Sequence, residues 1–181
     1  LSIRRQRQMC IRDRFNWCFK TEASENVNNR EILFPRGKGL GGSSSINGHL
    51  YVRGQQDDYN QWAQLGNIGW GYDDILPYFK KSEFKENGDE KYRGKSGPLF
   101  VSDIVEKHPL CEEFIESSKE IGVSIQKDYN SGNQEGIFYY QRTIKNGARF
   151  SAYDAFLKPA MKRKNVEVRT NTTCLLYTSP S

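Results

Sequence analysis

Apolar and polar residues alternate in several short stretches of this 181-residue chain. From Asn16 to Thr21 aromatic residues occupy every second position, which predicts a short strand. Apolar, β-forming residues gather at Leu99–Val101 and Phe138–Ile144 and predict two more strands. Valine and threonine alternate over Val166–Thr170, which predicts a last strand near the end of the chain.

Other segments place their apolar residues at helical spacing. This spacing predicts helices over residues 57–65, 73–83 and 109–121. Pro109 at the start of the last helix and Gly122 just after it fit the usual ends of a helix. Pro77 lacks an N–H group, so we expect it in the first turn of its helix, where that group would have no partner.

One more helix is predicted to begin at Ser151, which can cap it together with Asp154 three residues later. Pro159 should end this helix. Residues 86–96 are charged and contain glycines, so we expect an exposed loop. The elements together predict a mixed α/β fold, of the α+β kind within this chain.

A glycine-rich segment at Pro35–Gly54 carries the most chemistry in the sequence. It reads PRGKGLGGSSSINGHLYVRG, with five glycines around three serines ahead of an apolar stretch. Glycines at this density let the backbone approach a ligand closely, and their amides can surround an anion. The residues therefore predict a loop that lies against a flat, phosphorylated cofactor. A flexible linker is the alternative, but Leu40, Ile46 and Tyr51 are unusual in linkers.

The same segment resembles the first signature of the glucose–methanol–choline (GMC) flavoprotein oxidoreductases. The signature positions are filled in order by Gly37, Lys38, Leu40, Gly41, Gly42, Ser43, Ser44, Ile46, Asn47, Tyr51, Gly54 and Asn60. So many matching positions are far more specific than a lone GxGxxG motif.

Further stretches extend the resemblance to choline-dehydrogenase-like and alcohol-dehydrogenase-like bacterial members. They are Asn16-Trp17, the run from Asp57 to Glu83, GKSGP at 94–98 and GARFSAYDAFLKP at 147–159. The resemblance implies part of an FAD-binding Rossmann-like domain and the start of a substrate-binding domain. We expect residues 15–72 to be the FAD-covering segment and residues 73–173 to begin the substrate domain and return toward the flavin domain.

The resemblance also implies which residues contact the cofactor. They are Gly41, Gly42, Ser43, Asn47, Gly48, His49 and Leu50. FAD is expected to be held without a covalent bond, because Ile46 occupies the position at which some members attach it through histidine. The catalytic histidine of the family is expected outside this chain, so His49 is interpreted as a residue that lines the flavin and no catalytic residue is assigned here.

The two ends of the chain have a different origin in our interpretation. Residues 4–14 and 174–181 match, letter for letter, the translations of the two ends of a transposon-based sequencing adapter, so we expect residues 1–14 and 174–181 to be artefacts. The chain carries a net charge of +5, of which +4 lies in the first fourteen residues. A basic nucleic-acid-binding module is therefore only a weak alternative, and we expect no nucleic-acid partner.

Together these features predict a fragment of an FAD-dependent enzyme that oxidises the CH–OH group of a small-molecule alcohol. A hydroxynitrile lyase on the same scaffold is the alternative, because fold does not fix function.

Outside the adapter-like ends, Cys18 and Cys111 show no metal-ligand spacing, so no metal is expected. No apolar run approaches the roughly 20 residues of a membrane helix. We expect a cytoplasmic location, with membrane association as the alternative.

Overall fold

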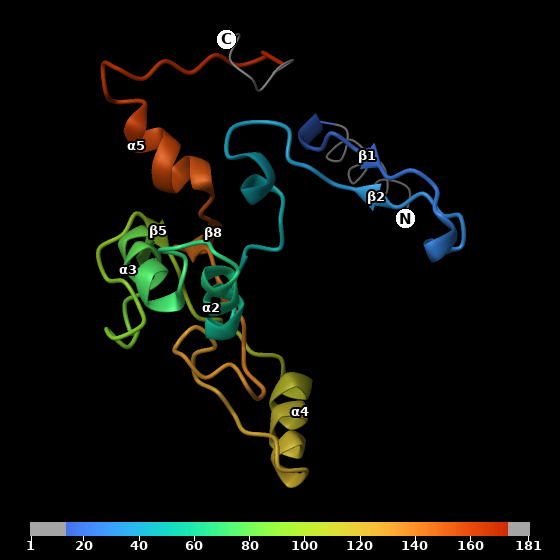
Figure 1. Cartoon of the computed structure of the whole chain (residues 1–181), viewed down its shortest axis with the longest axis vertical. Coiled ribbons are helices and arrows are strands. Elements are labelled where there is room, and N and C mark those ends of the chain that lie inside the picture. The colour runs from blue at the N-terminus through green and yellow to red at the C-terminus, as the bar shows by residue number, and fades with distance from the viewer. Residues whose placement is uncertain (1–13, 174–181) are drawn as a thin grey trace.

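The computed structural model describes residues 14–173, so the predicted adapter segments lie, except for Arg14, outside the described residues. Figure 1 shows an elongated arrangement, with a hairpin on one side, helices α2 and α3 in the middle and α4 at the far end. In chain order the helices and strands are β1 (Phe19–Lys20), β2 (Leu33–Phe34), β3 (Leu50–Tyr51), α2 (Gln56–Gln64), α3 (Tyr72–Ser82), β4 (Glu83–Phe84), β5 (Leu99–Phe100), α4 (Pro109–Glu120), β6 (Gln141–Arg142), β7 (Ile144–Lys145), β8 (Ala148–Arg149) and α5 (Lys158–Ala160). Helical turns also form at Glu25–Val27, Gly42–Ser45 and Tyr153–Leu157. The mixed helix and strand content confirms the predicted fold class.

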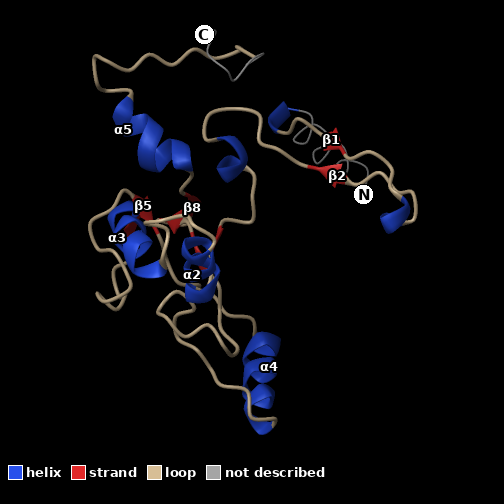
Figure 2. Ribbon diagram, in the orientation of Figure 1, coloured by secondary structure: helices blue, strands red, loops and turns tan. Residues whose placement is uncertain are grey.

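The strands are short and pair two by two, and loops connect most of the molecule (Figure 2). Antiparallel pairs join β1 to β2, β3 to β6 and β7 to β8, whereas β4 and β5 are parallel. A bridge between Ser102 and Arg142 links the second residue after β5 to β6. The pairs β3–β6 and β4–β5 are thereby connected, and they place the end of the glycine-rich segment beside residues from the second half of the chain.

Aromatic side chains hold α2 against α3. The Tyr59 ring lies 5.6 Å from Trp62 and 5.8 Å from Phe79, and Trp62 lies 5.7 Å from Trp70. Edge-on and tilted arrangements at these distances are favourable for aromatic pairs. These rings therefore pack the two helices that follow the glycine-rich segment against each other.

Polar side chains dominate the buried positions of the described residues. The buried apolar residues are Tyr72, Val101 and Ala155. The buried polar residues are Arg53, Glu83, Lys85, Arg93, Ser118, Asn130, Gln141 and Ser151. Because buried charges are costly unless they are paired, the interior depends on a network of ion pairs and hydrogen bonds.

Two predictions about local structure were wrong. Residues 166–170 form no strand, because the alternating pattern there finds no partner strand within the described part of the chain. Pro77 lies in the second turn of α3 rather than the first, since the helix begins at Tyr72. Its missing N–H leaves the carbonyl of Asp73 without its helical donor, but Asp73 is exposed and water can satisfy that carbonyl.

The loop predicted at residues 86–96 is present, but it is not exposed throughout. The side chain of Arg93 is 0% exposed, because its guanidinium is bound between two carboxylates. The helix predicted at Ser151 begins as expected: the Ser151 Oγ donates to Asp154 Oδ2 over 2.7 Å, and that carboxylate also accepts the Ser151 N–H at 3.0 Å. This helix ends at Ala160, next to Pro159.

Candidate functional site

The glycine-rich segment forms a tight turn that continues into β3. Gly41 has φ 87°, and a Cβ there would lie 2.5 Å from Ser45 Oγ, so neither the backbone nor the packing admits a side chain. Gly42 has φ 54°, but a Cβ there would meet nothing within 4 Å. The turn is therefore closely packed on the Gly41 side and open on the Gly42 side, where a ligand could reach the backbone.

Asn47 shapes the next part of the segment. Its Oδ1 accepts the N–H of His49 at 3.0 Å, which is the geometry of an Asx turn. His49 accordingly has φ 48°, in the left-handed region where histidine and asparagine are more common than bulkier residues. The same Asn47 oxygen accepts a 2.8 Å hydrogen bond from Nη1 of Arg149, and this nitrogen also donates to the carbonyl of Ser44 at 3.2 Å. Arg149 thus holds both ends of the turn.

His49 lies in an environment that disfavours its charged form. Desolvation lowers the pKa of its imidazole, and the positive charges of Arg149 and Arg142 lower it further. Its Nδ1 is buried and has no hydrogen-bond partner in the described residues. The neutral form of the imidazole is therefore favoured, and its buried Nδ1 is a polar atom that the described residues leave unsatisfied.

Two contacts attach the segment to the last part of the described chain. The Ser44 Oγ accepts the N–H of Ala152 at 2.9 Å, and the His49 carbonyl accepts the N–H of Thr143 at 2.8 Å. Leu50 follows in β3 opposite Arg142. The residue before β7 and the start of the last helix consequently hold the turn in place.

The seven predicted cofactor residues occupy one continuous stretch of this turn and strand. Gly41 and Gly42 begin it, Ser43 and Gly48 are exposed, and Leu50 is 49% exposed at its end. The sequence did not predict the role of Arg149 at the turn, and it assigned Ser44 and Ser151 no part in the site beyond the signature and the helix cap. Arg149 and Ser151 belong to the GARFSAYD stretch that carried part of the resemblance, so that stretch was the available signal. Contact with a flavin stays a prediction for all seven residues.

An ion cluster lies directly behind β3. Oε1 of Glu83 is 2.6 Å from Arg53 Nη2 and 2.8 Å from Arg93 Nε, and Arg93 Nη1 reaches Asp128 at 2.7 Å. Burial opposes the charge of Glu83, but the hydrogen bond from Arg93 and the positive charges of both arginines hold its pKa below the ordinary value. Burial, with the nearby Glu83 carboxylate, raises the pKa of Tyr51 to about 12. The paired charges of this cluster therefore hold β3 in a fixed position.

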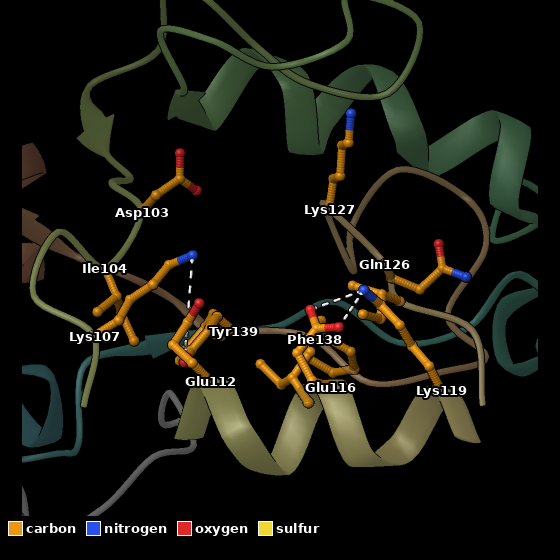
Figure 3. A pocket seen from close by; sticks show the side chains of 12 residues that line it. Asp103, Ile104, Lys107, Glu112, Glu116, Lys119, Gln126, Lys127, Phe138 and Tyr139 are labelled. Carbon is orange, nitrogen blue, oxygen red and sulfur yellow. Dashed lines mark hydrogen bonds and ion pairs between the residues drawn. The ribbon is translucent and has the colours of Figure 1, made fainter. Parts of the chain in front are cut away.

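A charged cleft of about 450 Å³ lies along α4. Figure 3 shows the side chains that line it. Its charges are largely paired across short distances: Lys119 lies 2.6 Å from Glu116, and Lys107 lies 3.7 Å from Glu112. Such exposed ion pairs contribute little to the free energy of folding. None of the seven predicted cofactor residues lines this cleft.

A second, more apolar groove of about 620 Å³ adjoins the glycine-rich segment. Leu50 lines it at one end, together with Phe114 of α4 and the aromatic residues Tyr139 and Tyr140. The described residues contain no cluster of three or more potential metal ligands and no helix long and apolar enough to cross a membrane.

Comparison with known proteins gives this site a family. Residues 18–176 match the family model for GMC oxidoreductases, and the chain belongs to that family. The chain is 49% identical over 156 residues to the oxygen-dependent choline dehydrogenase of Rhizobium meliloti (strain 1021), and 50% identical over 153 residues to that of Rhizobium etli (strain CIAT 652). These alignments cover 86% and 84% of the chain but 28% of each relative, so the chain spans less than a third of their length.

Solved structures of oxidoreductases share the fold. Pyridoxine 4-oxidase from Mesorbium loti superposes with a TM-score of 0.78 at 32% identity, over 83% of this chain and 30% of the other. An FAD-dependent oxidoreductase from Chaetomium thermophilum gives a TM-score of 0.74 at 28% identity, over 82% of this chain and 28% of the other. The family and these solved neighbours are FAD-dependent flavoproteins, which agrees with the cofactor that the signature implied.

Proposed function

We propose that this chain is the flavin-covering part of an FAD-dependent oxidoreductase that oxidises the CH–OH group of a small alcohol. The observation that carries the proposal is the glycine-rich turn, whose open side is lined by the residues that the family resemblance assigns to the cofactor. The choline dehydrogenase relatives support a small alcohol as the substrate class.

Two observations support a bound cofactor at this turn. A Cβ at Gly42 would project into open space, so the backbone there is accessible to a large planar group. The buried Nδ1 of His49 lacks a partner, and such an atom is costly unless a ligand or water satisfies it. Gly42, Asn47, Gly48 and His49 are the residues that would hold the flavin.

Bound FAD would supply the acceptor for the hydride that leaves the alcohol carbon. The role of this chain is to position that cofactor and to exclude water from it. Arg149 fixes the turn, and a neutral His49 presents its ring without introducing a charge. His49 is not proposed as the catalytic base, since burial lowers its pKa and the charges of two arginines make a further positive charge there unfavourable.

The test uses the full-length enzyme encoded by the gene that contains this chain. We expect a yellow protein whose flavin is released by acid precipitation, because Ile46 offers no covalent attachment point. Choline and a series of primary alcohols are then added under anaerobic conditions, and substrate-dependent bleaching of the flavin absorbance is expected. Cleavage of a cyanohydrin without any bleaching would instead support a hydroxynitrile lyase.

A further inference from the structure

Asn130 is joined to the strand that leaves the glycine-rich turn, although about 80 residues separate them in sequence. Its Oδ1 accepts the N–H of Arg53 at 2.8 Å, and its Nδ2 donates to the carbonyl of Tyr51 at 3.2 Å. Residues 51 and 53 are two apart, so these backbone groups face the same edge of the strand. The carboxamide of Asn130 therefore pairs with the strand as the backbone of a neighbouring strand would.

This contact begins where the regular pairing stops. β3 pairs with β6 at Leu50 and Tyr51, and Asn130 extends the hydrogen bonding along the same strand to Arg53. Nearby, Gln134 donates to the carbonyls of Arg53 and Gly54, both at 3.3 Å. The segment containing Asn130 and Gln134 thus supplies side chains in place of a further strand.

The carboxamide itself is held rigidly. Asn130 is 2% exposed, its Nδ2 also reaches Gln141 Oε1 at 3.2 Å, and its own N–H donates to Asp128 Oδ1 at 2.9 Å. Asp128 is in turn bound by Arg93 of the ion cluster. A buried amide with both its oxygen and its nitrogen engaged adopts one orientation, so Asn130 transmits the position of the cluster to the strand.

We propose that Asn130 is a positioning residue for flavin binding, which fixes β3 and hence the adjoining residues His49 and Leu50 that would contact the cofactor. This inference rests on the proposed function of the glycine-rich turn. Asn130 lies outside the family signature and outside the predicted cofactor residues. A purely structural asparagine would affect stability, whereas Asn130 is assigned an effect on FAD binding.

The experiment compares Asn130→Ala with Asn133→Ala in the full-length enzyme. Asn133 lies in the same loop, but it is exposed and its side chain accepts only the N–H of Glu135. We expect Asn130→Ala to weaken FAD binding by roughly tenfold or more, as the loss of two buried hydrogen bonds predicts, and to shift the flavin absorption bands. Asn133→Ala should bind FAD as the unaltered enzyme does.

A third variant, Val101→Ala, controls for stability alone. It removes buried methyl groups and should lower the melting temperature without changing FAD affinity at 20 °C, where circular dichroism confirms folding. Unchanged FAD affinity and spectrum in Asn130→Ala would overturn the proposal, as would an equal loss of FAD in Val101→Ala. If Asn130→Ala fails to fold, Gln134→Ala replaces it with an expected loss of about threefold, and no loss there overturns the proposal.

The two proposals fail in different ways. If the unaltered full-length enzyme binds no FAD, the proposed function itself is wrong. If the unaltered enzyme binds FAD and Asn130→Ala binds it equally well, only the positioning role is wrong.

Discussion

Arg149 donates a 2.8 Å hydrogen bond to Asn47 across 102 residues of sequence. The same guanidinium nitrogen bonds the Ser44 carbonyl, so one side chain from β8 spans the turn that the family signature specifies. The shape of the signature segment is consequently determined by a residue outside it.

Replacing Arg149 with methionine keeps an unbranched, apolar stem of the side chain and removes both hydrogen bonds. We expect the full-length enzyme to lose about 1–3 kcal/mol of stability in urea unfolding, and to bind FAD more weakly, because the turn is no longer held at Asn47. Arg163→Met is the matched control, since Arg163 is exposed and distant in sequence from the turn. Equal effects of the two substitutions would argue against the role of Arg149.

Gly42 and Gly122 offer a matched pair of glycine substitutions. Both have positive φ, 54° and 82°, and at both positions a Cβ would meet nothing within 4 Å. Alanine should therefore cost each site about 1–2 kcal/mol of backbone strain. Only Gly42→Ala should also reduce FAD retention, because its methyl group would occupy the open side of the turn. FAD retention is measured after gel filtration. An equal fall in both variants, or no fall in either, would contradict this prediction.

The buried ion cluster predicts a large effect at Glu83. Glu83→Gln leaves Arg53 and Arg93 without their shared carboxylate, and breaking a buried pair of this kind typically costs about 3–5 kcal/mol. Glu116→Gln serves as the control, because its pair with Lys119 is exposed and should change the free energy of unfolding by less than about 0.5 kcal/mol. Urea unfolding of both variants decides the matter.

The lowered pKa of His49 predicts a dependence of stability on pH. Above its ordinary pKa of 6.5 the imidazole is neutral in both the folded and the unfolded chain. As the pH falls below 6.5, the unfolded chain binds a proton at His49 before the folded chain does. The free energy of unfolding therefore decreases from about pH 6.5 down to the lower pKa of the folded state. Between pH 7.5 and 5.5 the unaltered enzyme should therefore lose more stability than His49→Gln. Parallel curves for the two proteins would show that His49 is not perturbed.

Local features of the fold were predictable where neighbouring residues decide them. Pro109 and Gly122 mark the ends of α4, and the pairing of Ser151 with Asp154 begins the last helix as expected. The strand expected at 138–144 is present in part, as β6 and the start of β7. The alternation at 166–170 predicted a strand that is absent, because a strand forms only where a second strand can pair with it.

The candidate site was predictable only along its own segment. The sequence predicted seven cofactor residues between Gly41 and Leu50, since they lie in one motif, and their contact with a flavin stays a prediction. It did not identify Arg149 or Asn130, because contacts over 102 and about 80 residues leave no periodic trace in a single sequence. The burial of Arg93 was missed for the same reason, as its charge alone suggested an exposed loop.

The long separation between Asn47 and Arg149 also has a consequence for synthesis of the protein. Ribosomes add about 5–20 residues per second, so the turn waits about 5–20 s for the residue that closes it. For most of that interval, until residue 142 is added, Leu50 and Tyr51 have no partner strand, because β6 has not yet been made. We expect nascent chains that stop before residue 149 to bind chaperones through this stretch and to capture no FAD.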